Sequence, residues 1–389
     1  MSSSAFLYGT LQRYSPPTWA DPIRFKPTSY VKLALRPTPI HQWHLPGVPS
    51  GYQVWVKRDD MTGSVLGGNK IRKLEFLLAD ALERGCDSVI TSGSLQSNHC
   101  RATALAARQL GLQPHLLLRW KGDMPKDLGA VGSEGNLLLD RAAGARIILT
   151  PHVRSERDTG PTQHEYATVT KTLHQMVTEY AEKLRSRGSN PYIIPVGGSN
   201  HIGSWGYIEA FRELMEEGAL DSFDDIVVAT GSGGTVCGLA IANYLTGLKV
   251  KLHAVCVCDT ADYFYGFVDR ELEQSGLKPT RDGAPLSSRD LIAIVDSYKG
   301  LGYGENTEEE LVNLIDIVNK TAVPLDPVYT LKGVRGLLGE LKNNPSSFSG
   351  SRILYIHTGG VFGLYDGKVT PLLKQLPATN QVSLYSETT

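Results

Sequence analysis

The sequence predicts an α/β protein made of two units with a cleft between them. Short apolar segments alternate with stretches of helical periodicity, and glycine-containing turns separate them, as is typical of parallel βαβ units. This alternation occurs as two successive series, and no internal repeat, low-complexity tract or long linker interrupts it. Ligands in such folds bind at the carboxyl ends of the strands, so we expect the functional site in the cleft.

The first series starts at a short apolar run, YQVWV, and continues to the middle of the chain. Strands are expected at 52–56, 88–91, 115–118 and 145–150, and helices at 69–84, 98–110, 136–142 and about 167–186. The segment 153–165 is the most polar of this half and is expected to be a loop.

The second series starts at the segment PYIIPVGGSN. Strands are expected at 224–230, 251–257 and 351–360, and helices at 203–217, 236–245, 308–319 and from Lys332 onward. The segment 263–290 is rich in Gly, Pro and Arg and is expected to be the least regular part of the chain.

Composition excludes several classes of protein. The chain has 389 residues, 41% of them hydrophobic, and a formal net charge of −1, which gives no reason to expect nucleic acid or a membrane surface as a partner. No apolar run approaches the roughly 20 residues of a membrane span. Five cysteines suit reduced thiols better than a disulfide framework, and the pair Cys256 and Cys258 is not expected to bind a metal.

The first 19 residues lack the basic start and apolar core of a secretory signal. They are rich in serine and free of acids, like an organellar presequence, but contain only one arginine, Arg13. We expect a cytoplasmic protein, and a mitochondrial or plastid location stays open.

The stretch LGGNKIRKLEF has positive charges where a helix is expected to begin. A helix is expected to begin near Asn69 as its N-cap, yet Lys70, Arg72 and Lys73 crowd its first turn. A helix N-terminus carries roughly half a positive charge, so cations there are unfavourable. Either this is an ordinary surface helix, or an anionic ligand gathers there and Lys70 has a special role. Arg72 and Lys73 would then favour the anion or simply point to solvent.

A glycine-rich turn, TGSGGT at 230–235, lies between an apolar strand and a helix. Such a turn can direct backbone N–H groups at a phosphate on the helix N-terminus. Val236 stands where a dinucleotide fingerprint needs its third glycine, and the Gly-Lys-Ser/Thr of a Walker loop is missing near Lys70. The turn therefore suits a small phosphorylated cofactor, although a tight turn that binds nothing is the alternative.

A second helix start, in SGSLQSNH, is also suited to an anion. Ser97 and Asn98 begin this helix, and further polar side chains flank them: Ser92, Ser94, Gln96 and His99. Simple helix capping is the alternative. A substrate carboxylate would be held well at this position.

A lysine after a glycine-rich turn, a serine/asparagine helix start and a single-phosphate turn are what a pyridoxal phosphate enzyme needs. Together, LGGNKIRKLE, TSGSLQSNH, EGNLLLDRAAGA, ATGSGGT, LGYGE, DPVYT and IHTGG resemble the D-cysteine desulfhydrase/1-aminocyclopropane-1-carboxylate (ACC) deaminase family. These are fold type II pyridoxal phosphate enzymes related to the tryptophan synthase β-subunit.

The resemblance implies two three-layer αβα domains with the active site between them. The larger, cofactor-binding domain would comprise 1–68 and 188–389, and the smaller one 69–187. It also implies a homodimer and a small amino-acid substrate.

The resemblance further implies roles for individual residues. Lys70 would bind the cofactor as a Schiff base, Asn98 would contact the ring hydroxyl, Tyr303 would stack near the ring, and Thr358 would lie by the ring nitrogen. The phosphate would be bound by Thr230, Gly231, Ser232, Gly233, Gly234 and Thr235. The catalytic set would be Lys70, Ser97 and Tyr303, and Gln96, Ser97, Asn98 and Tyr303 would contact substrate. His99 and His357 are expected to be structural, and no metal site is expected.

Two positions favour the desulfhydrase branch. ACC deaminases have Glu directly after the stacking tyrosine and Leu between His and Gly-Gly near the C-terminus. Here Gly304 follows Tyr303, Glu305 comes one place later, and Thr358 occupies the second position. A hydroxyl beside the pyridine nitrogen makes the cofactor a weaker electron sink, which suffices when a thiolate leaves.

The sequence thus predicts a pyridoxal phosphate lyase that converts D-cysteine to pyruvate, ammonia and hydrogen sulfide. ACC deamination, or elimination from another β-substituted amino acid such as D-serine or chloroalanine, is the alternative within the same chemistry. A non-catalytic pyridoxal phosphate-binding protein and a nucleotide-binding protein are alternatives from other classes.

Overall fold

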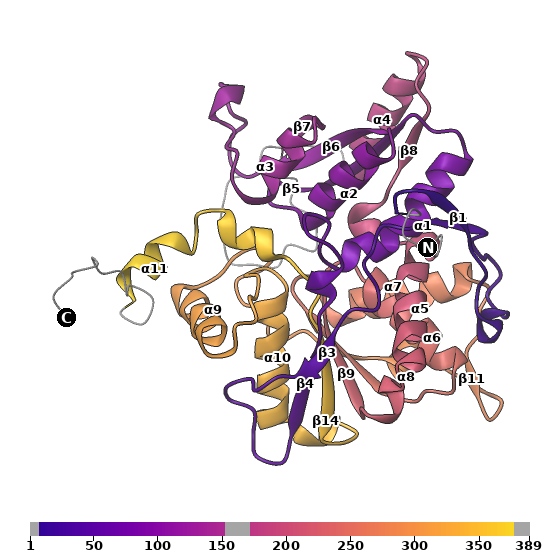
Figure 1. The fold of residues 1–389 in the computed structure, drawn as a ribbon, viewed down its shortest axis with the longest axis vertical. Helices are drawn as coiled ribbons and strands as arrows, with labels where there is room; N and C mark the ends of the chain where they lie inside the picture. The colour runs from indigo at the N-terminus through magenta and orange to yellow at the C-terminus, as the bar shows by residue number, and fades with distance from the viewer. Residues whose placement is uncertain (1–7, 152–171, 377–389) are drawn as a thin grey trace, which may run out of the picture.

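The computed structural model describes residues 8–151 and 172–376, which form two parallel sheets, one above the other in Figure 1. The larger sheet has the strand order β13-β10-β9-β14-β4-β3 and is parallel except for β3, which pairs antiparallel with β4. Its strands are β3 (Ile40–Gln42), β4 (Gln53–Lys57), β9 (Asp225–Thr230), β10 (Lys251–Cys256), β13 (Ala293–Val295) and β14 (Arg352–Ile356).

Helices cover both faces of the larger sheet. One face packs against α5 (His201–Glu216), α6 (Gly234–Leu245) and α7 (Ala261–Gln274), and the other against α9 (Glu308–Thr321) and α10 (Thr330–Asn343). Side chains alternate accordingly along β9, since Ile226 and Val228 enter the first core and Val227 enters the second. Every residue of β9 is buried, which explains the uninterrupted apolar run at 226–229 in its middle.

The smaller sheet is wholly parallel, with the order β7-β6-β5-β8. Its strands are β5 (Ser88–Ser94), β6 (Gln113–Trp120), β7 (Arg146–Pro151) and β8 (Pro191–Ile193). Helices α1 (Asn69–Glu83), α2 (Asn98–Gln109) and α3 (Gly135–Ala142) contribute to the cores on one face, and α4 (Leu173–Arg185) packs on the other.

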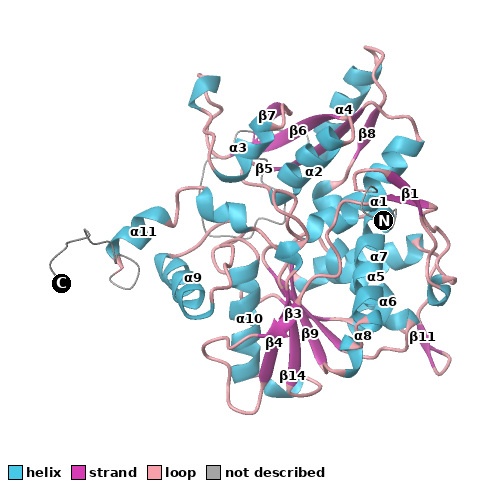
Figure 2. Ribbon diagram, in the orientation of Figure 1, coloured by secondary structure: helices cyan, strands magenta, loops and turns pink. Residues whose placement is uncertain are grey.

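The remaining elements are short and lie at the periphery, as the strands and helices of Figure 2 show. They are the two-stranded sheets β1 (Leu11–Arg13)/β2 (Ser29–Val31) and β11 (Thr280–Arg281)/β12 (Ala284–Pro285), and the helices α8 (Ser288–Leu291) and α11 (Thr370–Gln375). None of the helices in the described ranges is both long and apolar enough to cross a bilayer.

The predicted α/β architecture is confirmed, and the predicted domain limits stay a prediction. Strand β8 lies beyond the predicted limit at residue 187, yet it pairs with β5. By strand pairing, therefore, the smaller unit extends at least to Ile193.

Three sequence predictions were wrong or fall partly outside the described residues. The segment 263–290 is not wholly irregular, because α7 buries Phe264, Val268 and Leu272 at four-residue spacing. Gly68, not Asn69, is the N-cap of α1. The predicted loop 153–165 and the start of the helix predicted at 167 lie outside the described ranges, and the described helix begins after Thr172.

Candidate active site

Lys70 is the second residue of α1 and is buried. The helix starts beside the end of β14, where Asn69 N donates to Thr358 O at 3.0 Å. Burial lowers the pKa of the Lys70 ammonium to about 8, against the opposing attraction of Asp326. A substantial fraction of this amine is therefore neutral near physiological pH, as a nucleophile or base must be.

Tyr329, which the sequence analysis did not assign to the site, faces Lys70. Lys70 Nζ lies 5.6 Å from the centre of the Tyr329 ring. Tyr303 contacts Tyr329 in turn, with the two hydroxyl oxygens 2.8 Å apart and the rings edge to face. The motif DPVYT was the only sequence signal for Tyr329, since nothing in its spacing relates it to Lys70. The stacking role of Tyr303 stays a prediction.

The glycine-rich turn 230–235 packs tightly against its neighbours. A Cβ on Gly231 would lie 2.9 Å from Tyr329 Cε1, and one on Gly234 would lie 2.6 Å from Ser199 Oγ. Glycine is required at these positions, and the start of α6 is where a small anion would bind backbone N–H groups; Gly234 N donates to Ser199 Oγ at 3.3 Å. At its far end, Thr235 Oγ1 accepts a hydrogen bond from Asn69 Nδ2 at 3.0 Å, which joins the turn directly to α1.

Lys73 and Ser199, neither of which was in the predicted site, lie against this turn. Lys73 Nζ donates to Ser199 Oγ and to Gly197 O, both at 3.3 Å, and Ser199 Oγ lies 2.7 Å from Ser232 Oγ. Burial and the neighbouring charge of Lys70 lower the pKa of Lys73 well below its ordinary value. An anion at the turn would relieve this, so the cation-rich first turn of α1 suits a phosphate.

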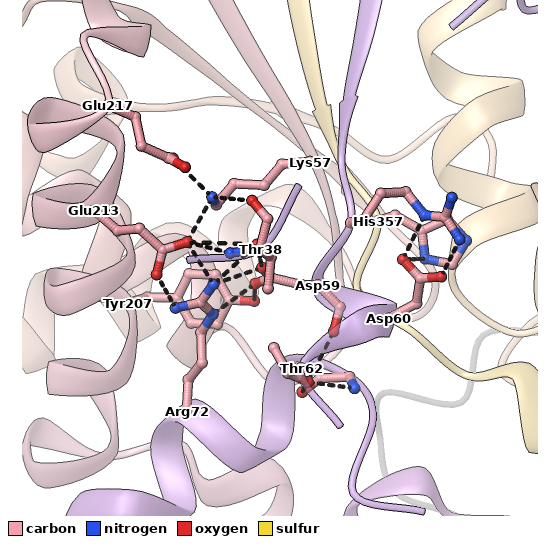
Figure 3. Close-up of polar contacts among 12 residues, drawn as sticks. Thr38, Lys57, Asp59, Asp60, Thr62, Arg72, Tyr207, Glu213, Glu217 and His357 are labelled. Atoms are coloured by element: carbon pink, nitrogen blue, oxygen red, sulfur yellow. Dashed lines mark hydrogen bonds and ion pairs between the residues drawn. The ribbon is translucent and has the colours of Figure 1, made fainter. Parts of the chain in front are cut away.

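Arg72 points away from the turn into a buried ionic network, shown in Figure 3. Its guanidinium donates to Asp59 at 2.7 and 2.9 Å and to Glu213 at 2.9 and 3.1 Å. Lys57 Nζ pairs with Glu213 at 2.6 Å, and Tyr207 donates to Asp59 at 2.6 Å. Burial alone would raise the pKa of Glu213, but Arg72 and Lys57 lower it to about 2. The network ties the start of α1 to β4 and α5, and neither Arg72 nor Lys73 points to solvent.

Two side chains at the start of α2 differ in their bonding: Ser97 caps the helix, and the side-chain oxygen of Asn98 has no partner among the described residues. Ser97 is the N-cap, and its Oγ accepts from Cys100 N at 3.2 Å. Asn98 Oδ1 is buried and has no hydrogen-bond partner within the described ranges. Because buried polar atoms are usually paired, this oxygen is available to a ligand. The neighbouring His99 ring bonds Thr91 Oγ1 at 2.8 Å, in keeping with a structural role.

Gln96 is engaged elsewhere, because its amide bonds the start of α3. Its Nε2 donates to Glu134 O at 3.0 Å, and its Oε1 accepts from Asn136 N at 2.9 Å. Its predicted contact with substrate stays a prediction.

The two predicted threonines lie at the carboxyl ends of their strands. Thr230 ends β9, and its hydroxyl is buried without a partner among the described residues. Thr358 is buried just beyond β14, next to the start of α1. His357, beside it, bonds Pro324 O at 2.9 Å and lies 3.5 Å from Asp60, as a structural residue would.

The arrangement fits pyridoxal phosphate. Lys70 supplies a reactive amine, the turn 230–235 with Lys73 and Ser199 supplies donors for a phosphate, and Tyr329 supplies a ring face between them. The unpartnered oxygens of Asn98 and Thr230 are free for further contacts. Within the described ranges no cluster of His, Cys, Asp or Glu could bind a metal ion.

Comparisons with known proteins agree with this fit. The family model for pyridoxal-phosphate dependent enzymes matches residues 31–359. The chain is 46% identical to the mitochondrial bifunctional D-cysteine desulfhydrase/ACC deaminase of Arabidopsis thaliana, over 92% of this chain and 84% of that protein. It is 35% identical to the D-cysteine desulfhydrase of Klebsiella pneumoniae, over 87% and 96% of the two chains.

A crystal structure of an ACC deaminase homologue superposes with a TM-score of 0.72 at 33% identity, covering 93% of this chain and all of the other. The fold is therefore that of the fold type II enzymes, as predicted. The chain belongs to the D-cysteine desulfhydrase/ACC deaminase family of pyridoxal phosphate-dependent enzymes.

Proposed function

We propose that this enzyme is a lyase that eliminates sulfide from D-cysteine to give pyruvate, ammonia and hydrogen sulfide. The observation that supports this best is the position of Lys70, a buried amine of lowered pKa that faces the Tyr329 ring, which itself packs against the glycine-rich turn. The family contains both D-cysteine desulfhydrases and ACC deaminases, so the substrate is the part that needs argument.

In this proposal, pyridoxal phosphate, when bound, withdraws electrons from the substrate Cα and so makes its proton removable. Lys73, Ser199, Ser232 and the turn 230–235 hold the phosphate, and Asn98 and Thr358 orient the ring. Ser97 and the start of α2 hold the substrate carboxylate. Once free, Lys70 Nζ accepts the Cα proton, which its lowered pKa allows near neutral pH.

Residues around Tyr329 and Thr358 support the desulfhydrase branch. If the stacking tyrosine of the family is the one that faces the lysine, it is Tyr329, and the next residue is Thr330. Thr330 Oγ1 donates to Asp326 Oδ1 at 2.8 Å and is buried, so a neutral hydroxyl stands where ACC deaminases have Glu. Thr358 likewise differs from the residue that ACC deaminases have at its position, which is leucine. These two positions favour elimination over ring opening.

ACC deamination is the second candidate, and one specific observation favours it. The Arabidopsis thaliana relative, at 46% identity, carries both activities in its name. The same relative is described as mitochondrial, so the predicted cytoplasmic location and its organellar alternative both stay open. The homodimer stays a prediction, which light scattering after size-exclusion chromatography would test.

A substrate panel tests the proposal. The purified holoenzyme is assayed with D-cysteine, L-cysteine, D-serine, β-chloro-D-alanine and ACC, and sulfide, pyruvate, ammonia and 2-oxobutanoate are measured. We expect sulfide and pyruvate from D-cysteine, none from L-cysteine, and none with Lys70→Ala. Turnover of ACC without sulfide from D-cysteine would contradict the proposal in favour of the deaminase. Bound cofactor with no turnover of any substrate would favour a non-catalytic protein.

A further inference from the structure

Arg119 lies near the carboxyl end of β6, between its register partners Ser94 on β5 and Thr150 on β7. Its side chain is half-buried, and Nε is fully buried without a hydrogen-bond partner. Within residues 8–151 and 172–376, the guanidinium has neither an ion pair nor a hydrogen bond. A guanidinium offers five N–H donors and is rarely buried unless it is paired.

Two other buried arginines show how the protein provides hydrogen-bond acceptors for a buried guanidinium. Arg72 uses its donors on Asp59 and Glu213. Arg101 donates to Asn136 Oδ1 at 3.2 Å and to Gly67 O at 3.1 Å. Against this pattern, the buried Nε of Arg119 is a donor left available for an anionic ligand.

Arg119 lies close enough to Tyr303 and Cys258 for its charge to act on both. Burial raises the pKa of Tyr303, and the Tyr329 hydroxyl, Arg119 and Ser94 oppose this rise. Burial likewise raises the pKa of Cys258 well above its ordinary value, and Arg119 opposes it. Tyr303 bonds Tyr329, and Cys258 Sγ donates to Gly231 O at 3.3 Å, so both neighbours contact the candidate active site.

The site therefore has two separate groups of donors on the side of the smaller sheet. One is the start of α2 with Ser97, which the proposed function assigns to the substrate carboxylate. The other is Arg119 with Ser94 and Tyr303. An α-amino acid has only one carboxylate, so the second group matches the remaining polar part of the substrate, its β-substituent.

We propose that Arg119 binds the β-substituent of the substrate and stabilises the negative charge that develops there, an inference that rests on the proposed function. In D-cysteine the Cβ–S bond breaks and its electron pair goes to sulfur, which leaves as hydrosulfide. The pair of the Cα–H bond becomes the Cα–Cβ double bond, and the proton goes to Lys70 Nζ. No oxidant or reductant is needed.

Arg119 thereby acts as a specificity-determining residue. A guanidinium N–H interacts weakly with a neutral thiol and strongly with hydrosulfide, so it stabilises the transition state more than the bound substrate. Chloride is a far weaker base than hydrosulfide and leaves without such help. The requirement for Arg119 should therefore be large for D-cysteine and small for β-chloro-D-alanine.

The test compares Arg119→Gln, Arg119→Lys and the control Arg146→Gln with the wild-type holoenzyme on these two substrates. Arg146 lies at the opposite, amino end of β7 in the same sheet. Loss of one group that stabilises a developing charge costs on the order of 100-fold in kcat. We expect this loss for Arg119→Gln with D-cysteine, with KM less affected, and less than about tenfold with β-chloro-D-alanine. Arg119→Lys should recover part of kcat, and Arg146→Gln should behave as wild type.

A second readout does not depend on turnover. Sulfide is the product, so it should inhibit Arg119→Gln more weakly than wild type in the β-chloro-D-alanine assay. An equal fall on both substrates would overturn the inference, because Arg119 would then serve a part that both share, such as the carboxylate. An unchanged kcat would overturn it too. Wild-type enzyme without sulfide release from D-cysteine would instead refute the proposed function itself.

Discussion

Lys73 Nζ donates a hydrogen bond to Ser199 Oγ at 3.3 Å, so a lysine from α1 lies against the glycine-rich turn of the other unit. This contact uses Lys73, the third cation of the first turn of α1, which lies three residues beyond Lys70. It explains why the sequence concentrates positive charge at the positive end of a helix. The positive charges of Lys70 and Lys73, unfavourable by themselves at this end of a helix, suit a dianionic ligand that both lysines contact.

Replacing Lys73 with Met should weaken the binding of pyridoxal phosphate. A hydrogen bond to a charged group contributes about 1.5–3 kcal/mol, so we expect the Kd to rise about 10- to 100-fold. Titration of the apoprotein with the cofactor, followed by visible absorbance, measures this. Lys126→Met, at an exposed position, is the matched control. An unchanged Kd for Lys73→Met would place the phosphate elsewhere.

The stability of the apoprotein should depend on pH through Lys70. In the folded apoprotein Lys70 loses its proton near pH 8, and in the unfolded chain near its ordinary value of 10.5. Below pH 8 both states are protonated and burial of the charge destabilises the fold; between pH 8 and 10.5 the unfolded chain binds more protons, so stability rises.

Apo Lys70→Met should therefore be more stable than apo wild type at pH 7. Its free energy of unfolding in urea should be higher by as much as about 3 kcal/mol. This difference should shrink as the pH rises from 8 to 10.5. Urea titrations of both proteins at pH 7 and 10 measure it. A difference that stays constant over this range would show that the Lys70 ammonium is not the source.

Arg72→Met should be strongly destabilising, because it leaves Asp59 and Glu213 as buried charges without their partner. Breaking a buried pair on one side costs about 3–5 kcal/mol. Arg212→Met provides the comparison, since Arg212 pairs with the exposed Glu216 on the same helix α5 and should cost less than about 1 kcal/mol. Similar losses for the two variants, measured by urea unfolding, would contradict a structural role for the network.

Gly234→Ala should impair cofactor binding without unfolding the protein. The new Cβ would lie 2.6 Å from Ser199 Oγ and 2.9 Å from both Lys73 Nζ and Ser199 Cα, so both donors and the backbone at Ser199 must move away from the turn. Gly266→Ala in α7 is the control, because its Cβ would meet only Arg270 at 3.5 Å and alanine favours helices. We expect Gly234→Ala to raise the Kd for pyridoxal phosphate and Gly266→Ala to leave it unchanged. Equal affinities would mean that the turn does not bind the phosphate.

The elements that were predicted well are those in which several consecutive residues are apolar because all of them are buried. β9 and β14 contain continuous apolar runs because helices cover both faces of the sheet. Helix α7 was missed because its buried apolar residues, Phe264, Val268 and Leu272, lie four residues apart, with aromatic residues and a glycine in the first interval and charged residues in the second. The Gly- and Pro-containing segment that follows made the whole region look irregular.

The candidate site was only partly predictable, for a different reason. Lys70 and the turn 230–235 have local patterns that indicate chemistry by themselves. Tyr329 lies 259 residues from Lys70, and only the fold brings its ring to 5.6 Å from the amine. The sequence around Arg72 does not reveal where its side chain points, because its partners Asp59 and Glu213 come from distant parts of the chain.

Helix α1 joins the two units at the candidate site. Arg72 anchors its first turn to Asp59, just beyond β4, and to Glu213 of α5, and Asn69 bonds Thr235 in the glycine-rich turn. The apolar face of the same helix shares a core with β5 and α2 of the smaller unit. Lys70 is therefore held by both units, and any change in their relative position must be accommodated by the helix that carries the reactive amine.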